Sequence, residues 1–159
     1  MNTVTLISSN VFGEGQDIRK VIPRFIHKAL QDEPLEIEGG EQTRDFYHVE
    51  NLVRLITQII DRTDISGELF NVGGEYEIKI SELARKIIQN TNSNSIITVK
   101  PYRFDDTQNS RLTLQTRKTK RILSYRLIVP FQQGLQRTIG FMRRQKNTQQ
   151  YEGLCAEHQ

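Results

Sequence analysis

The chain has 159 residues, which is enough for one domain with a buried core and too few for two. Apolar residues make up 36% and charged residues 26%, as in an ordinary soluble globular protein, and no apolar run approaches the ~20 residues that span a bilayer. The single cysteine, Cys155, excludes an internal disulfide framework and a cysteine-based zinc site. The N-terminus lacks the pattern of a signal peptide, so we expect a cytoplasmic protein.

The first half of the chain predicts short strands between helices. Residues 3–8 are β-branched and predict a strand that ends before a glycine-containing loop. Apolar residues at helical spacing predict a helix over residues 21–30, with Pro23 tolerated in its first turn. Residues 35–38 alternate as a short strand, and an apolar stripe predicts a second helix over residues 50–62.

The second half continues this alternation. We expect a buried strand over residues 69–72, a third helix after Ser81 and another strand over residues 96–99. A short basic helix at residues 116–123 and a final helix, with Leu135 and Ile139 on its inner face, complete the predicted elements. From residue 147 onward the sequence is polar and aperiodic, so we expect residues 147–159 to form a disordered tail behind a region of residues 1–146.

The positive charge is concentrated in one stretch. The whole chain carries a net charge of +3, and residues 100–146 hold twelve Lys or Arg and only two acids, Asp105 and Asp106. Such a stretch attracts phosphate-bearing ligands or nucleic acid, or forms a solvated helix surface. The basic residues are not interleaved with aromatic residues, so we do not expect nucleic-acid binding.

The sequence predicts neither a metal site nor a catalytic set. The three histidines lack metal-ligand spacing, and there is no nucleophile elbow and no P-loop. His48, near Asp45 and Tyr47, could act as a base, but without a nearby nucleophile a structural role is favoured. Gly13 and Gly15 follow a predicted strand, but the third glycine of a dinucleotide-binding turn is missing.

Several short motifs follow one another in an order that carries a resemblance. The first, SNVFGEG, begins at Ser9. The others, each given with its first residue, are VIPRF at Val21, EQTRDF at Glu41, HVENLV at His48, FNVGG at Phe70, SELA at Ser81, LQTRKTKRIL at Leu114 and QGL at Gln133. This series, running from about Val4 to Arg144, resembles the NAD-dependent nucleotide-sugar epimerase/dehydratase family, the extended short-chain dehydrogenases/reductases.

The resemblance implies an α/β fold. In that family an N-terminal Rossmann domain holds NAD and a smaller domain holds the nucleoside diphosphate sugar. Residues 1–146 would then be the C-terminal substrate-binding region, made of the last part of a Rossmann-type sheet plus the small mixed α/β domain. The protein would be the part of an epimerase or dehydratase that binds a nucleotide sugar.

The resemblance also implies the substrate-binding residues. Asn10 would hydrogen-bond the substrate near its diphosphate or sugar, Arg44 would pair with the diphosphate, and Arg111 would be a second phosphate-facing arginine. Val21 and Ile22 would open the helix that borders the nucleotide pocket. Each has an alternative: Asn10 commonly stabilises a turn, for instance, and Arg44 could form a surface ion pair with Asp45.

Departures from the family pattern limit these expectations. None of the five tyrosines is followed four residues later by lysine, so the catalytic Y-x-x-x-K is absent, as is the glycine-rich NAD fingerprint. Around the pocket, Ile7 stands where the family has arginine, Gln115 where it has an acid, and the G-D-G turn is shortened to Gly39-Gly40.

The partners follow from these departures. We expect no cofactor to be bound by this chain alone and, because hydride transfer needs both a nicotinamide and an acid/base, no catalysis by it alone. The strand from Thr3 to Ser8 would have an uncovered edge, which predicts either a partner chain that supplies the Rossmann half or self-association through that strand. The alternative function is a non-catalytic binding or regulatory module that reuses the fold as an interaction surface.

Overall fold

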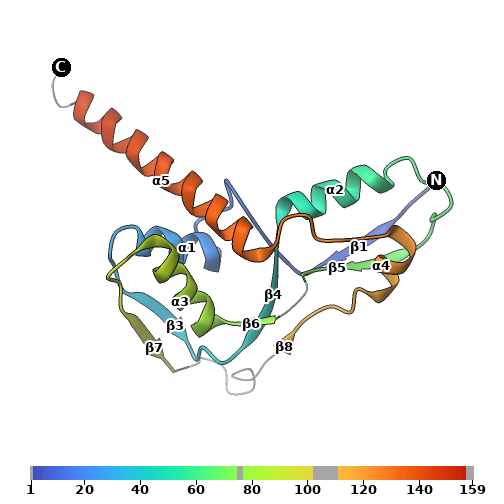
Figure 1. The fold of residues 1–159 in the computed structure, drawn as a ribbon, viewed down its shortest axis with the longest axis horizontal. Helices are drawn as coiled ribbons and strands as arrows, with labels where there is room; N and C mark the ends of the chain where they lie inside the picture. Colours follow the sequence, from blue (N-terminus) through green and yellow to red (C-terminus); the bar gives the residue numbers. More distant parts are fainter. Residues whose placement is uncertain (1, 75–76, 102–110, 157–159) are drawn as a thin grey trace.

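The computed structural model describes residues 2–74, 77–101 and 111–156. The strands are β1 (Thr5–Ser8), β2 (Asn10–Phe12), β3 (Leu35–Glu38), β4 (Thr43–His48), β5 (Leu69–Val72), β6 (Glu77–Lys79), β7 (Ile97–Lys100) and β8 (Arg111–Leu112). The helices are α1 (Val21–Ala29), α2 (Val49–Ile59), α3 (Ile80–Thr91), α4 (Arg117–Leu123) and α5 (Phe131–Ala156). Figure 1 shows these elements in an elongated molecule, with α5 projecting from one end and the β1–β5 pair at the other.

The strands form three small sheets that are mostly parallel. Strand β1 pairs in parallel with β5, and β3 pairs in parallel with β7. Strand β4 is the centre of the third sheet: it pairs in parallel with β2 and β8 and antiparallel with β6. The expected α/β fold with parallel strands is therefore confirmed.

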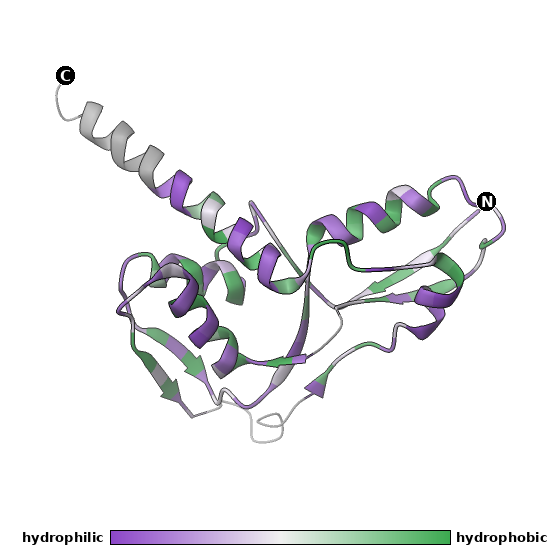
Figure 2. Ribbon diagram, in the orientation of Figure 1, coloured by the Kyte–Doolittle hydropathy of each residue, from purple (hydrophilic) through white to green (hydrophobic). Residues whose placement is uncertain are grey.

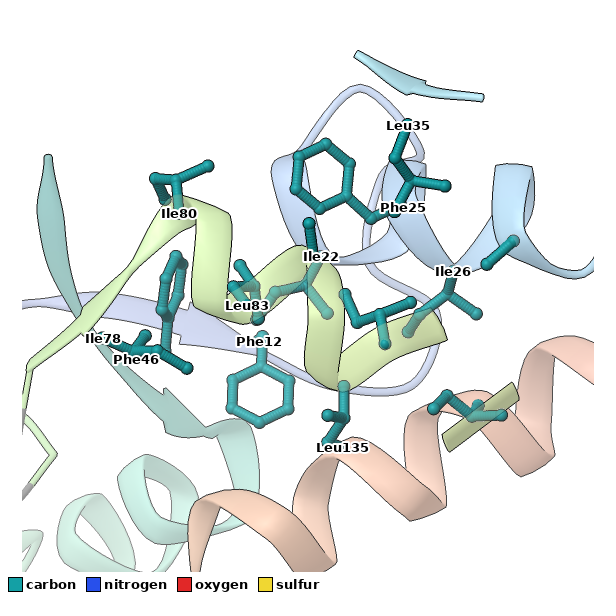
Figure 3. Close-up of a cluster of buried hydrophobic side chains, with 14 of the residues drawn as sticks. Phe12, Ile22, Phe25, Ile26, Leu35, Phe46, Ile78, Ile80, Leu83 and Leu135 are labelled. Atoms are coloured by element: carbon teal, nitrogen blue, oxygen red, sulfur yellow. The ribbon is translucent and has the colours of Figure 1, made fainter. Parts of the chain in front are cut away.

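Two separate hydrophobic clusters form the core. The first lies among α1, α3, α5 and the strands beside them (Figure 3), and its labelled members include Phe12, Ile22, Phe25 and Leu83. The second lies where α2 and the segment from α4 onward pack on the β1–β5 pair, and contains Leu55 and Phe70. Figure 2 shows apolar residues alternating with polar ones along α1 and α2, as expected for helices that bury one face.

Helix α1 shows how the sequence positions the first cluster. Its buried residues recur at helical spacing and are Ile22, Pro23, Phe25, Ile26 and Ala29. Proline is tolerated there because the first-turn amides of a helix have no partner within the helix. The helix therefore begins at Val21 with its apolar face inward and its polar face, which carries Arg24 and Lys28, toward β3.

The structure differs from the sequence expectations in two places. Strands β2, β4, β6 and β8 were not predicted, because each is short or carries polar and charged residues that do not alternate cleanly. Residues 147–156, expected to be a disordered tail, continue α5 as far as Ala156. The glutamine, glutamate, leucine and alanine residues of this segment are good helix formers, so the helix can extend without an apolar stripe. The remaining residues of the expected tail, 157–159, lie outside the described residues.

Candidate functional site

A cavity of about 540 Å³ opens beside the first cluster. It lies among β2, β3, β4, β7 and the outer face of α1. Its walls combine apolar side chains of the cluster with a ring of charged and amide groups; the lining residues are Asn10, Val21, Arg24, Phe25, Lys28, Glu36, Ile37, Glu38, Gln42, Arg44, Phe46, Ile80 and Lys100. An apolar wall with a few polar groups is typical of small-molecule sites.

The charges around this cavity favour an anion. Four cationic side chains line it against two carboxylates, Glu36 and Glu38. Lys100 is paired with Glu36 at 2.9 Å between Nζ and Oε2, and this hydrogen bond holds the pKa of the Glu36 carboxyl below its ordinary value. The cavity wall therefore keeps an excess of positive charge at neutral pH, which attracts a phosphate-bearing ligand.

Asn10 lies where the cavity meets the central sheet. It is the first residue of β2 and stands in register with Phe46 on β4. Its side-chain amide donates to the carbonyl of Asp45 across 3.0 Å, which fixes the orientation of the side chain. Asn10 also lines a second cavity of about 350 Å³, so it lies where the two cavities adjoin.

Arg44 and Asp45 lie on opposite faces of β4. The partly buried Arg44 lines the cavity, and its guanidinium Nη1 donates to the carbonyl of Thr43 at 2.7 Å. Asp45 is only 1% exposed and accepts the backbone N–H of Gly74 at 2.8 Å. Burial raises the pKa of the Asp45 carboxyl, although the hydrogen bond from Gly74 acts in the opposite direction. The expected alternative of a surface ion pair between them is therefore wrong, since successive side chains of a strand point to opposite faces.

Val21 and Ile22 stand at the N-terminus of α1, but they face different ways. Val21 lines both cavities, whereas Ile22 lines the smaller one and has its side chain in the first cluster at 1% exposure. Neither a capping side chain from Lys20 nor an acid in the first turn occupies this helix end. Its backbone amides and helix dipole thus favour an anion at the junction of the cavities.

Arg111 is not brought into the cavity. It is the first residue of β8, opposite Thr43 of β4, and its side chain is 74% exposed. Its Nε donates to Oε1 of Glu77 at 2.6 Å, and this bond lowers the pKa of the Glu77 carboxyl. Arg111 therefore lies on β8, which pairs with the strand of Arg44, but only Arg44 lines the cavity.

His48 has a structural position. It is 2% exposed, precedes α2 and accepts the backbone N–H of Glu50 through Nδ1 at 3.4 Å. Its Nε2 lies 3.0 Å from Oε2 of Glu14, and its ring meets Phe12 edge-on. These contacts hold the start of α2 against the loop after β2, which agrees with the favoured structural interpretation.

Three cavity cations were not singled out from the sequence. Arg24 and Lys28 are four residues apart on α1 and so share its polar face, a signal that the helical pattern already contained. Lys100 reaches the cavity because β7 pairs with β3, and no local sequence pattern predicts that pairing.

The loop that contains Gly13 and Gly15 does not have the geometry of a dinucleotide-binding turn. Gly13 is packed closely against Val49 of α2, and the helix that follows the Gly13–Gly15 loop begins only at Val21, so no strand–turn–helix cradle forms there. In the part of the chain that the structure describes, no three His, Cys, Asp or Glu residues gather as metal ligands. None of the described helices has the length and hydrophobicity of a membrane-spanning segment.

Residues 1–73 match the sequence model of the NAD dependent epimerase/dehydratase family. The UDP-N-acetyl-alpha-D-glucosaminuronate decarboxylase of Bacillus cytotoxicus is 36% identical over 134 residues, which are 80% of this chain and 41% of that protein. Human dTDP-D-glucose 4,6-dehydratase is 33% identical over 145 residues, 86% of this chain and 40% of that protein.

Solved structures also resemble this chain over less than half of their own length. The UDP-glucose 4-epimerase of Thermotoga maritima with UDP-glucose superposes with a TM-score of 0.83 at 26% identity, over 91% of this chain and 47% of that one. An epimerase of Methanothermobacter thermautotrophicus gives a TM-score of 0.84 at 33% identity, over 93% and 45%. The chain thus spans about 40% of the length of the curated relatives described above and less than half of these two structures.

Proposed function

Because the chain corresponds to part of a protein of the NAD-dependent epimerase/dehydratase family, we propose that it is the C-terminal, substrate-binding portion and binds a nucleoside diphosphate sugar. In this proposal, β1 and β5 are the last strands of a Rossmann-type sheet, and the remaining elements form the small substrate domain. The support for the ligand class is that relatives are named for UDP- and dTDP-sugars.

The observation that carries the proposal is the convergence of Asn10, Val21 and Arg44 on one cavity with excess positive charge. Arg44 would pair with the diphosphate, since a guanidinium matches two phosphate oxygens at once. The backbone amides at the start of α1 would donate hydrogen bonds to the same phosphate group, next to the oriented side chain of Asn10. The role proposed for Ile22 is limited to its backbone, because its side chain is in the core.

Arg111 has a weaker place in this proposal. For Arg111 to reach the ligand, its guanidinium would have to leave Glu77. We assign it a secondary contact and expect its loss to matter less than the loss of Arg44.

We further propose that the chain alone performs no hydride transfer. That chemistry needs a nicotinamide against the sugar and an acid/base at the reacting hydroxyl. The sequence has no Y-x-x-x-K, and Gly13 and Gly15 do not form a dinucleotide turn. The chain's own residues would bind and orient the nucleotide sugar, and the redox step would require groups from another polypeptide.

The test is thermal unfolding with UDP-glucose and dTDP-glucose, using free glucose as the negative control. Binding to the folded state raises the midpoint of unfolding, and the rise grows with the logarithm of the ligand concentration above the dissociation constant. We expect a rise for a nucleotide sugar, abolished by Arg44→Gln and kept by Arg54→Gln, because Arg54 is exposed on α2 and does not line the cavity. No rise with either nucleotide sugar, or an equal rise in the Arg44→Gln variant, would overturn the proposal.

A further inference from the structure

The cavity around Arg44 has two walls that carry different charged and polar groups. Asn10 and Arg44 stand on β2 and β4, whereas a second wall is formed by α1, β3 and β7 and carries Arg24, Lys28 and Lys100. Figure 1 shows the β3–β7 pair at the end of the molecule away from the β1–β5 pair. The pairing of a diphosphate with Arg44 gives no role to the three cations of this second wall.

Helix and strand geometry bring these cations together. Arg24 and Lys28 are four residues apart, so their side chains lie on one face of α1. Lys100 is in register with Glu38 where β7 pairs with β3, and Glu36 lies two residues earlier, on the same face of β3. Lys100 and Glu36 are therefore diagonal neighbours across the two strands, and Nζ of Lys100 lies 2.9 Å from Oε2 of Glu36.

Three cations act on the carboxylate of Glu36. Besides the hydrogen bond from Lys100, the positive charges of Lys28 and Arg24 lower the pKa of the Glu36 carboxyl, and every charged group that acts on it is a cation. The side chain of Glu36 is 49% exposed, and an exposed ion pair such as the one with Lys100 is weak, so the side chain can turn into solvent. Glu36 therefore marks a position where a negatively charged group is stabilised.

Arg24 and Lys28 keep donors for a further anion. Within the described residues neither forms an ion pair: the guanidinium of Arg24 lies 5.7 Å from the centre of the Phe25 ring, and Nζ of Lys28 donates to the carbonyl of Pro34 at 3.4 Å. A guanidinium has five N–H donors and an ammonium has three, so most of these donors are not used by the two contacts. A phosphate accepts from several such donors at once, which a neutral group cannot match.

We propose that the wall of Arg24, Lys28 and Lys100 is a second anion subsite, which binds a phosphate group other than the diphosphate assigned to Arg44. The carboxylate of Glu36 occupies this subsite when no such ligand is bound. The subsite depends on contacts within α1, β3 and β7 and does not require that the chain bind a nucleotide sugar.

Two sources of the phosphate fit this position. Lys28 is seven residues after Val21, which is about 10 Å along the axis of α1. A nucleotide whose 5′ phosphates bind at the start of α1 would reach the wall with its nucleoside, and a phosphate on its ribose would fill the subsite. This source rests on the proposed function. The other source is a phosphate on a separate small molecule.

Binding at this subsite exchanges one anion for another. Without ligand, the ammonium of Lys100 pairs with Glu36; with ligand, it contacts the phosphate and Glu36 turns into solvent. The Glu36 carboxylate therefore competes with the ligand. Removing its charge should tighten phosphate binding, whereas the loss of a merely structural contact would not.

The test uses inorganic phosphate as the probe, with chloride as the control anion at the same ionic strength, while backbone amide resonances are followed by NMR. We expect saturable changes around Lys28 and Lys100. Glu36→Gln should lower the dissociation constant at least about threefold, and Lys28→Gln should raise it at least about fivefold. Lys86→Gln is the matched control, because Lys86 pairs with Glu82 on α3 and does not line the cavity.

Two further titrations identify the source of the phosphate. If the nucleotide carries it, uridine 3′,5′-bisphosphate should bind at least about tenfold more tightly than uridine 5′-monophosphate, and Lys28→Gln should remove the difference. If a separate molecule carries it, inorganic phosphate should bind with the same dissociation constant when the protein is saturated with UDP-glucose.

Three results would overturn the proposal. The first is the absence of any saturable change with phosphate beyond that with chloride. The second is phosphate binding that Glu36→Gln does not tighten, or that Lys28→Gln and Lys86→Gln affect equally. The third is phosphate that UDP-glucose displaces, together with no gain from the 3′ phosphate, because the anion would then bind at Arg44. A missing thermal shift with nucleotide sugars would contradict the proposed function alone, since the phosphate titration needs no nucleotide.

Discussion

The two hydrophobic clusters differ in how completely the chain covers them. The first is enclosed by α1, α3 and α5, and its outer wall forms the charged cavity. The second has α2 on one face and α4 at one edge, but its remaining edge exposes Ile7 and Ile60. This difference shows that the described chain covers the first cluster itself, whereas it leaves apolar side chains exposed at one edge of the second.

The largest expected effect is the loss of stability when an apolar side chain is truncated to alanine, and this loss should differ between the two clusters. Phe25→Ala removes a side chain that is 1% exposed in the enclosed cluster and should lower the free energy of unfolding by about 3–5 kcal/mol. Ile7→Ala removes a side chain that is 42% exposed and should lower it by about 1 kcal/mol or less. Urea unfolding at low protein concentration measures both, and similar losses at the two sites would contradict the comparison.

A smaller effect is expected at the closed edge of the second cluster. Thr119 is fully buried and its hydroxyl donates to the carbonyl of Asn71, so Thr119→Val leaves an edge carbonyl without its donor. We expect a loss of about 1–2 kcal/mol in the free energy of unfolding. Thr57→Val is the matched control, because its hydroxyl bonds within α2 at the surface, and it should stay within about 0.5 kcal/mol. Equal effects would mean that α4 does not close the edge.

The smallest effect concerns the junction of the clusters, where Asp45 binds Gly74. Burial raises the pKa of the Asp45 carboxyl above its unfolded value of 3.8. The charged form is therefore less favourable in the folded protein, and this penalty applies above the folded pKa and is relieved as the pH falls through it toward 3.8. Compared with Asp45→Asn, the wild type should gain stability on acidification. Urea unfolding of both proteins from neutral pH downward checks this, and a difference that stays constant would contradict it.

Helices and buried strands were the predictable part of the fold. The apolar periodicity around Phe25, Leu55 and Leu83 reflects burial of one helix face and so places α1, α2 and α3 within a few residues. Strand β4 was missed because its sequence, TRDFYH, mixes charges with aromatic residues. Its position depends on pairing with three other strands, which local patterns do not encode.

The candidate site was predictable in part and for a similar reason. Asn10, Val21 and Arg44 came from the resemblance, and the structure places all three at one cavity. Arg111 did not join them, because its side chain pairs with Glu77 of β6, a strand that also pairs with β4. Lys100 was missed because only the parallel pairing of β3 and β7 brings it to the wall.

The most direct test of the central claim is to follow backbone amide resonances by NMR while UDP-glucose is added. The account predicts that the shifts change at Asn10, at Val21 and around Arg44, at the junction of the two cavities. The exposed basic helix α4 (Arg117–Leu123) should remain unchanged. Changes confined to α4, or no changes at saturating ligand, would contradict nucleotide-sugar binding in this cavity.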